Sequence, residues 1–299
     1  MAEAPGSSSR QRWTLVLVCT ATFMLLLDIT VVSVALPSIQ RDLHASLPDL
    51  QWVIDAYTLV LAVLLLPAAT VGDRLGRRRL FLAGLAVFTA GSLACALAPT
   101  ALALELFRAL QGVGGAVLFA TGTPLLRAEF SGPALARALG AFGATIGGAT
   151  AIGPLAGGVL TDALGWRSIF VINLPIGAAA FAAGVARLRE SRGPARGAAD
   201  WPGTALITGA LTALMFALIR GNSAGWGSPV IVALFAAAAA ALAGFVFYEL
   251  RIAAAPMADL RLFARPSQAP GAQPHGRLGC ARRTRPAGPR PGVGCPVEP

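Results

Sequence analysis

Runs of apolar residues, each about long enough to cross a lipid bilayer, recur along most of this chain and constrain its fold more than any other feature. A membrane-spanning helix needs roughly 20 such residues. The runs show no strand-like alternation, and in lipid every backbone amide needs a partner inside the protein, so each run is predicted to be a helix. The predicted spans are residues 13–37, 51–71, 80–98, 102–126, 136–160, 168–187, 203–219 and 229–248. The expected fold class is an all-α polytopic membrane protein of about 8 spans.

The composition supports a membrane protein. The chain is 56% hydrophobic and 13% charged, whereas about a quarter of the residues of a soluble domain are charged. All 24 basic residues are arginine, which is typical of a GC-rich bacterial genome. The formal net charge of +10 would suit a nucleic-acid-binding protein, so the positions of the arginines decide between the two explanations.

The arginines gather in alternate loops, and this predicts the orientation of the chain. If the first span starts in the cytoplasm, twelve arginines fall on the cytoplasmic side and three on the opposite side. The cytoplasmic ones are Arg10, Arg12, Arg74, Arg77, Arg78, Arg79, Arg127, Arg137, Arg187, Arg189, Arg192 and Arg196, and the others are Arg41, Arg167 and Arg220. The pattern predicts a multi-pass protein of the bacterial inner (plasma) membrane, with residues 1–12 cytoplasmic and no nucleic-acid partner.

The chain lacks the residue patterns of a metal site or an enzyme. Its four cysteines, Cys19, Cys95, Cys280 and Cys295, do not have the spacing of zinc ligands or of a disulfide framework. No nucleophile or pair of carboxylates has the spacing that catalysis on a lipid substrate would need. Neither a metal site nor an enzymatic activity is therefore expected.

One carboxylate interrupts the first span. The stretch LLLDITVVSVALP places Asp28 near the middle of the apolar run. An ionisable side chain there costs about 2.5 to 3.5 kcal/mol on insertion scales and usually faces the bundle interior. The favoured interpretation is functional, because an interior carboxylate can titrate and couple a proton to a conformational change. The alternative is structural: Asp28 accepts hydrogen bonds from neighbouring Thr or Ser side chains.

A second charged position lies in span four, within LELFRALQGVGGA. Helical spacing places Glu105, Arg108 and Gln111 on one face. Two interpretations stay open: Arg108 has a function inside the bundle, or it forms a local pair with Glu105 and extends outward to the membrane surface. The glycines that follow lack a preceding strand, so they are predicted to allow close helix packing rather than to bind phosphate.

Span five is rich in glycine, with GAFGATIGGATAIGPLAGGV at its centre. Gly143, Gly147, Gly153 and Gly157 recur at helical spacing, which predicts tight contact with a neighbouring helix. Pro154 interrupts the backbone hydrogen-bond ladder and permits a bend.

The loop VGDRLGRRR between spans two and three is too short to be only a solvated linker. Gly72 and Gly76 are expected to allow a sharp turn. Asp73 can interact with a helix N-terminus or with an arginine, and the arginines anchor the cytoplasmic face.

Together these segments resemble the major facilitator superfamily, and within it the fourteen-span drug:proton antiporter family. The loop AATVGDRLGRRRLF is similar to the superfamily signature between spans two and three, although Ala69 and Gly72 depart from it. The matching residues are Asp73, Arg74, Gly76, Arg77 and Arg78. Span four resembles the motif of a membrane arginine linked to proton coupling, carried onto Arg108, Gln111 and Gly112.

Three further segments carry the resemblance. Span five resembles the antiporter motif, which implies that Gly153, Pro154, Gly157 and Gly158 shape an alternating-access hinge. LDITVVSVALP resembles the first-span motif of the drug-efflux family, which implies that Asp28 is a coupling or substrate residue. WRSIFVINLP resembles the family's start of span six.

The resemblance implies a domain organisation and a mode of action. Residues 13–187 would form the N-terminal six-helix half, residues 188–202 a cytoplasmic linker, and residues 203–248 two additional helices. A small amphipathic or cationic substrate would bind between two halves, and alternating access would export it. The proton gradient would supply the energy, with no cofactor.

The pattern stops near the C-terminus. Residues 249–267 are similar to the segment leading to the next span, but residues 268–299 are rich in Pro, Gly and Arg and are expected to be disordered. The abrupt change is interpreted as a frameshift or premature stop, and the alternative is a basic tail that binds anionic lipid. Two hypotheses follow: a proton-coupled drug exporter, or a transport-incompetent fragment that needs a partner chain to supply a missing half.

Overall fold

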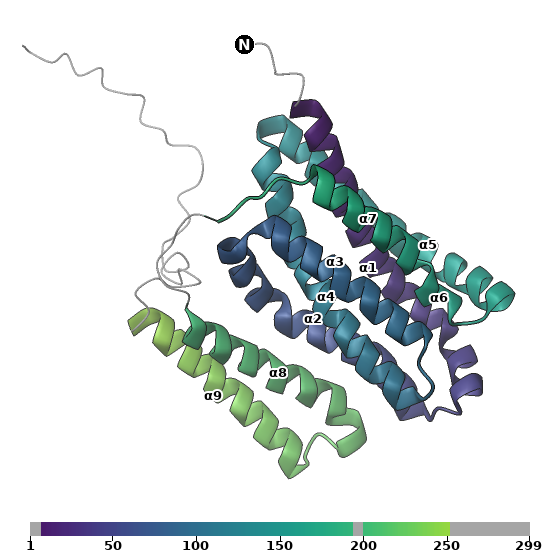
Figure 1. Ribbon diagram of the computed structural model, residues 1–299. Helices are drawn as coiled ribbons and strands as arrows, with labels where there is room; N and C mark the ends of the chain where they lie inside the picture. Colours follow the sequence, from purple (N-terminus) through teal and green to yellow (C-terminus); the bar gives the residue numbers. More distant parts are fainter. Residues whose placement is uncertain (1–6, 194–199, 252–299) are drawn as a thin grey trace, which may run out of the picture. The chain divides into compact units, whose positions relative to one another are not determined.

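The computed structural model describes residues 7–193 and 200–251, and the elements in these ranges are helices (Figure 1). They are α1 (Ser7–Leu43), α2 (Leu47–Leu75), α3 (Arg77–Ala96), α4 (Ala101–Glu129), α5 (Gly132–Leu164), α6 (Ser168–Val171), α7 (Asn173–Arg187), α8 (Trp201–Ala224) and α9 (Pro229–Arg251). Of these, 8 stretches are long and apolar enough to cross a membrane, with α6 and α7 together counting as one. The predicted all-α, eight-span fold is confirmed for the described residues.

Most of the helices are longer than the predicted apolar runs, whereas the outer bounds of span six agree with the prediction. α1 has 37 residues, or about 55 Å at 1.5 Å per residue, which exceeds the roughly 30 Å of a hydrocarbon core. Hydropathy identifies only the part of a helix that lies in lipid, so the polar ends were left out of the prediction. The predicted tail at 268–299, most of the segment at 249–267 and residues 1–6 lie outside the described residues.

Local sequence signals explain several helix ends. Ser46 caps α2 in a capping box, in which its side chain accepts from Asp49 N and Asp49 accepts from Ser46 N. Thr100 caps α4 by accepting from Ala103 N. Gly165, with φ of 81°, ends α5, and Gly76, with φ of 112°, separates α2 from α3.

Glycines set how closely the central helices approach. α4 lies between α2 and α3. A methyl group on Gly114 of α4 would lie 2.4 Å from the Phe88 backbone nitrogen of α3, and one on Gly112 would lie 2.7 Å from the Tyr57 carbonyl oxygen of α2. The close packing predicted for this glycine cluster is thus present.

The glycines of span five differ in whether another helix packs against them. Methyl groups on Gly153 and Gly157 would meet Thr30 and Val31 of α1, at 1.8 Å and 3.1 Å. Methyl groups on Gly143 and Gly147 would meet nothing within 4 Å among the described residues. The tight contact predicted for all four glycines is therefore wrong for these two, because Gly143 and Gly147 lie on an exposed face of α5.

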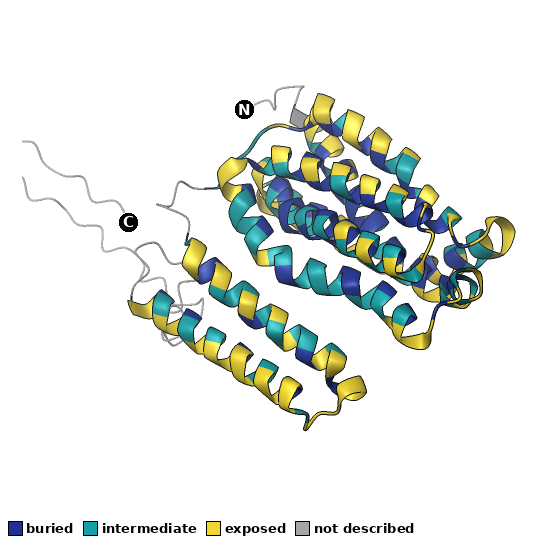
Figure 2. Cartoon of the chain, turned by 60° about the horizontal axis from the view of Figure 1, so that its bottom comes forward, coloured by how far each residue is buried: buried dark blue, intermediate teal, exposed yellow. Residues whose placement is uncertain are grey.

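α8 and α9 form a helical hairpin, and α8 also lies along α2. Trp52 of α2 meets Phe216 of α8 with ring centroids 5.9 Å apart. Figure 2 shows that the outward faces of these helices are largely exposed, and the exposed large side chains of α9, such as Val230 and Phe247, are apolar. An apolar exposed face is expected where lipid is the solvent.

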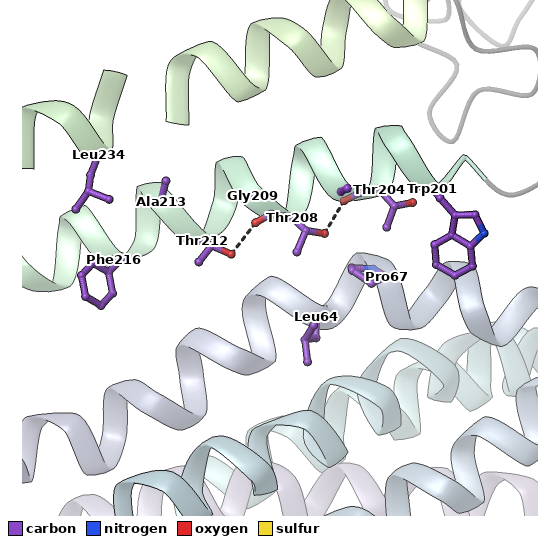
Figure 3. Close-up of a pocket in the computed structure, with 11 residues that line it drawn as sticks. Leu64, Pro67, Trp201, Thr204, Thr208, Gly209, Thr212, Ala213, Phe216 and Leu234 are labelled. Carbon is purple, nitrogen blue, oxygen red and sulfur yellow. Dashed lines mark hydrogen bonds between the residues drawn. The ribbon is translucent and has the colours of Figure 1, made fainter. Parts of the chain in front are cut away.

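A groove of about 800 Å³ runs between α2 and α8 (Figure 3). Thr208 donates its hydroxyl to the Thr204 carbonyl at 2.6 Å, and Thr212 donates to the Thr208 carbonyl at 2.7 Å. The hydroxyl hydrogens that would otherwise face the groove are thus already bonded within α8. What remains is a mainly apolar surface, compatible with contact to lipid tails.

Candidate functional site

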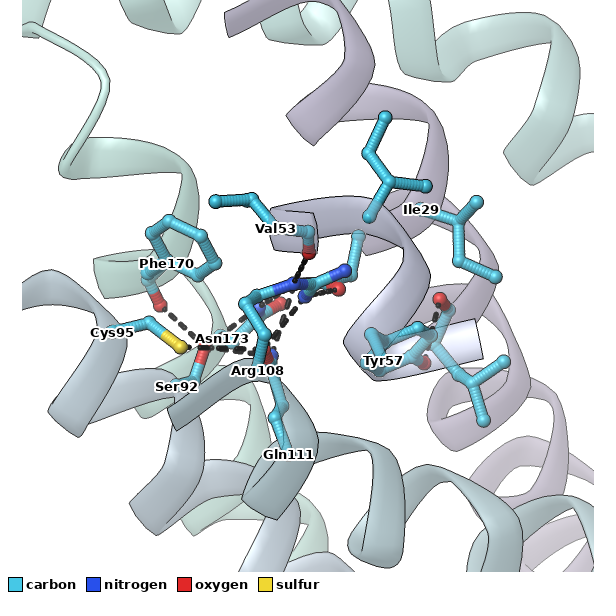
Figure 4. Close-up of polar contacts among 12 residues, drawn as sticks. Ile29, Val53, Tyr57, Ser92, Cys95, Arg108, Gln111, Phe170 and Asn173 are labelled. Carbon is cyan, nitrogen blue, oxygen red and sulfur yellow. Dashed lines mark hydrogen bonds and ion pairs between the residues drawn. The ribbon is translucent and has the colours of Figure 1, made fainter. Parts of the chain in front are cut away.

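Two ionised side chains meet in the interior of the helical bundle. Arg108 of α4 forms an ion pair with Asp28 of α1 through its Nη1 and the carboxylate Oδ2. Both side chains are 1% exposed. A lone charge in such a place is strongly unfavourable, so each group makes the burial of the other tolerable. Figure 4 shows the polar side chains that surround the pair.

The carboxylate of Asp28 has protein donors for both of its oxygens. Oδ2 accepts from Arg108, and Oδ1 accepts from Gln111 Nε2 at 3.0 Å and from Asn173 Nδ2 at 3.5 Å. These donors come from α4 and α7. The ionised form of Asp28 therefore holds three helices together through hydrogen bonds that replace water.

Arg108 is held from several sides at once. Its Nε donates to the Val53 carbonyl of α2 at 3.1 Å, and its Nη1 also donates to Gln111 Oε1 at 2.7 Å. The guanidinium carbon lies 4.2 Å from the centroid of the Tyr57 ring and 5.9 Å from that of Phe170. A planar guanidinium can stack on a ring and donate in its own plane, which a lysine ammonium cannot do.

Ser92 extends the network to α3 and α6. Its hydroxyl donates to the Phe170 carbonyl at 3.1 Å and accepts from Asn173 at 3.0 Å and from Gln111 at 3.3 Å. Ser92, Asn173 and Gln111 are all buried. The network therefore joins polar groups from α1, α2, α3, α4, α6 and α7 in an otherwise apolar interior.

Glycine again permits the approach of the helices. A methyl group on Gly91 of α3 would lie 2.8 Å from the Gln111 Cα. The absence of that side chain lets Gln111 reach both Ser92 and Asp28. The sequence motif of span four thus combines the polar residues with the small residues that bring their partners close.

The structure excludes one of the two interpretations that the sequence left open for Arg108. Arg108 is buried and pairs with Asp28, so the local pair with Glu105 and the outward-extending side chain are both wrong. Thr30 and Ser33 donate to carbonyls of α1 itself, at 3.0 Å and 3.1 Å. They are therefore not the donors that the structural alternative for Asp28 expected.

Three residues of this region were missed by the sequence reasoning. Asn173 and Ser92 are polar residues inside apolar spans, and this was the signal that could have marked them. Asp55 of α2 is a third case, since it is half-buried and its Oδ2 has no hydrogen-bond partner among the described residues. A carboxylate within the run at 51–71 is the same kind of signal that singled out Asp28.

The signature residues between spans two and three form a second cluster. Asp73 pairs with Arg77 four residues later, with Nη2 and Oδ1 2.8 Å apart. Arg77 also donates to the Pro124 carbonyl of α4 at 3.4 Å. Gly76 makes the turn, as predicted, whereas Gly72 lies inside α2, against Leu80 and Thr121. Arg74 lies in the last turn of α2.

The segment after α7 docks onto this cluster. Glu190 accepts from the Arg78 backbone nitrogen at 3.1 Å and forms an ion pair with Arg79 at 3.6 Å. Arg77 N donates to the Ser191 carbonyl at 2.8 Å. Arg78 contributes its side chain, which donates to the Val185 carbonyl at 2.7 Å. The sequence predicted a plain linker here and did not identify Glu190 as the acid that faces the arginines.

Replacing Glu190 by Ala is expected to loosen residues 188–193. The substitution removes the acceptor of the Arg78 amide and the partner of Arg79, while the α3 helix itself stays intact. Trypsin cleavage after Arg192 should become several-fold faster, because cleavage follows the population of the open segment. The bond after Arg189 is not compared, since the substitution changes the residue that follows it. Gel analysis of limited proteolysis measures it. Glu129→Ala serves as the control, and equal cleavage of both variants would contradict a docked segment.

Two of the span-five glycines pack on the turn of α1 that follows Asp28. Gly153 and Gly157 pack on Thr30 and Val31, which follow Asp28 in α1 by less than one turn. Pro154 lies inside α5, and a methyl group on Gly158 would meet nothing within 4 Å. A change in the α1–α5 contact would therefore act close to the ion pair.

Within the described residues, no group of three or more His, Cys, Asp or Glu side chains could hold a metal ion. What the arrangement provides is a buried carboxylate and a buried guanidinium, each of which makes the burial of the other tolerable.

Comparison with known proteins relates this architecture to transporters. Residues 18–256 match the Major Facilitator Superfamily. The tetracenomycin C resistance and export protein of Streptomyces glaucescens is 41% identical over 266 residues, which cover 88% of this chain and 49% of that protein. The multidrug resistance protein Stp of Mycobacterium tuberculosis is 40% identical, with coverage of 87% and 48%. The chain spans about half the length of the curated relatives it matches.

The solved structures agree at the level of the fold. The POT family transporter PepTSo superposes with a TM-score of 0.58 at 15% sequence identity, over 79% of this chain and 52% of that one. With eight candidate membrane spans among the described residues and a family match over most of its length, the chain belongs to the major facilitator superfamily.

Proposed function

We propose that this chain supplies the proton-coupling site of a drug exporter that works by alternating access. The observation that carries the proposal is the buried ion pair between Asp28 and Arg108, whose carboxylate is fully hydrogen-bonded inside an apolar bundle. The printed names of the relatives, a resistance and export protein and a multidrug resistance protein, support drug export as the class of activity.

The proposed coupling follows from the electrostatics of the pair. When Asp28 binds a proton, its charge disappears and Arg108 is left as an unpaired buried cation. That state is unfavourable in the packed arrangement, so protonation favours a conformation in which Arg108 finds water or another partner. Loss of the proton restores the pair and the packed arrangement. The equilibrium between the two conformations is thus tied to proton binding.

The remaining assignments belong to the same proposal. The substrate is a small amphipathic or cationic molecule, the proton gradient supplies the energy, and Gly153, Pro154, Gly157 and Gly158 form a hinge. The protein lies in the bacterial inner membrane with a cytoplasmic amino terminus, as the arginine distribution supports. On that side, Asp73, Arg74, Gly76, Arg77 and Arg78 would gate the opening, with Glu190 as their partner.

The test is drug-dependent proton movement in everted membrane vesicles that contain the full chain. Ethidium, a cationic amphipathic probe, should release protons from energised vesicles, as read by a pH-gradient dye. Asp28→Asn keeps the shape of the side chain but cannot ionise, so it should abolish the ethidium-dependent signal. Asp42→Asn is the matched control, because Asp42 lies on the same helix but is about half exposed and pairs with Arg167.

The outcomes separate clearly. Loss of the signal in Asp28→Asn and its retention in Asp42→Asn support the proposal. A signal that survives in Asp28→Asn excludes Asp28 as the coupling residue. Absence of the signal in the unsubstituted chain, with the protein folded by size-exclusion chromatography, excludes drug:proton exchange by this chain.

A further inference from the structure

A second groove lies on the surface between α1 and α7, away from the buried ion pair. It runs from Trp13 to Thr20 along α1 and from Ala183 to Pro175 along α7, and its volume is about 440 Å³. Seven helical residues correspond to about 10 Å of length. The two helices contact each other along this stretch, side by side in Figure 1.

The floor of the groove is apolar and its walls are uneven. Leu17 and Ala180, 2% and 5% exposed, form the floor. Ala179 and Ala183 on the α7 side are too small to fill the space, whereas Trp13 and Val16 stand up on the α1 side at 37% and 53% exposure. The small residues leave room for a narrow hydrocarbon chain, but small residues also line helix–helix contacts in membranes, so the charge at the end of the groove distinguishes the two occupants.

The groove ends at a cluster of cationic side chains. The guanidinium carbon of Arg187, one turn beyond Ala183, lies 5.4 Å from the Trp13 ring centroid. Arg12 and Arg10 are exposed at the same end of α1. None of the ion pairs among the described residues includes these three arginines. Glu129 of α4 is a nearby acid, but its contact with α1 is made by the backbone. Its carbonyl oxygen accepts from Gln11 Nε2 at 2.9 Å.

We propose that this groove binds an anionic phospholipid, with one acyl chain along the apolar floor and the phosphate held by Arg187 and Arg12. Tryptophan is enriched at the depth of the lipid headgroups, and arginine binds phosphate through paired N–H groups. The arginines at the end of the groove would bind the phosphate, and the apolar floor would hold the acyl chain of the same lipid. This proposal does not depend on drug transport.

Charge argues against a second copy of the chain as the occupant. All copies insert into the membrane in the same orientation, so a symmetric partner would bring its own arginine cluster to the same depth. The two clusters would repel each other, whereas a phosphate group neutralises them.

The test is lipid binding to the purified full chain in detergent, followed by native mass spectrometry. Dioleoyl phosphatidylglycerol and dioleoyl phosphatidylcholine share their acyl chains and differ in net charge. Phosphatidylglycerol should bind more tightly. Arg187→Gln should weaken its binding about fivefold, in line with the usual gain per arginine near anionic lipid, and should leave phosphatidylcholine binding unchanged. Arg189→Gln removes the same charge just outside the groove and should have a smaller effect.

Two neighbouring alanines give a matched test of the acyl-chain position. Ala179 lines the groove and Ala178 does not, and both are exposed. Ala179→Phe should fill the groove and weaken the binding of both lipids several-fold, while Ala178→Phe should leave it unchanged.

Three results would overturn the proposal. One is equal affinity for the two lipids, and another is an equal effect of the two phenylalanine variants. The third is a mass of two chains that Ala179→Phe reduces to one, which would assign the groove to a second copy.

Discussion

Replacing Arg108 by Gln is expected to lower the free energy of unfolding of the chain by about 3 to 5 kcal/mol. The substitution leaves the buried Asp28 carboxylate without its counter-ion in an apolar interior. It also removes the donor to the Val53 carbonyl and the cation that stacks on Tyr57. Chemical denaturation of the purified chain in detergent, followed by intrinsic fluorescence, measures the change.

A double substitution separates the charge from the packing. Asp28→Asn together with Arg108→Gln removes both charges, so the pair of changes should cost clearly less than the sum of the two single changes. Arg167→Gln is the control, because it breaks the ion pair with Asp42, in which both side chains are nearly half exposed. Arg167→Gln should change the free energy of unfolding only slightly. An Arg108→Gln variant as stable as Arg167→Gln would show that the buried pair does not stabilise the bundle.

Gly114→Ala and Gly147→Ala are expected to change stability in opposite directions. A methyl group on Gly114 would lie 2.4 Å from the Phe88 backbone nitrogen, so α3 and α4 would have to move apart. Overpacking of this kind costs about 1 to 3 kcal/mol, or more where backbone must shift. A methyl group on Gly147 would meet nothing within 4 Å, and replacing a helical glycine by alanine adds up to about 1 kcal/mol of stability.

Thermal unfolding of the two variants in the same detergent measures the difference. The midpoint temperature should fall for Gly114→Ala and rise for Gly147→Ala. Gly84→Ala is a second test of the same interface, since its methyl group would lie 2.5 Å from the Val117 side chain. The Val117 Cβ would lie 2.9 Å from the same methyl group and does not move when the side chain rotates, so Gly84→Ala should also lower the midpoint. Equal midpoints for all three variants would contradict the packing of α3 against α4.

Much of the fold was predictable because the membrane restricts the options. Any apolar run of about 20 residues in lipid has to form a helix. The eight predicted spans are therefore present, and only their polar ends were missed. Span six is divided by a break at Ile172 between α6 and α7. Hydropathy does not detect such a break, since it averages over a window in which Asn173 is outweighed by its apolar neighbours.

The candidate site was predictable in part. Asp28 and Arg108 were selected as charged residues inside apolar runs, and Gln111 through the motif that it shares with Arg108. Their partnership was not predicted, because the nearest acid along the chain, Glu105, was the obvious partner by spacing. Asn173 lies 145 residues from Asp28, and no periodicity relates residues so far apart.

The sequence by itself therefore determined the spans and the kinds of residue that cannot remain alone in lipid, since these depend on the transfer of each side chain from water. The tertiary structure alone decided which residues meet. Asp28 pairs with Arg108 because glycines such as Gly91 and Gly112 let the helices approach at that level. Glu190 reaches the arginines after Gly76 because Gly76 has no side chain that would collide with its carboxylate. A buried charge requires a partner, but only the packing of backbones selects which one comes within reach.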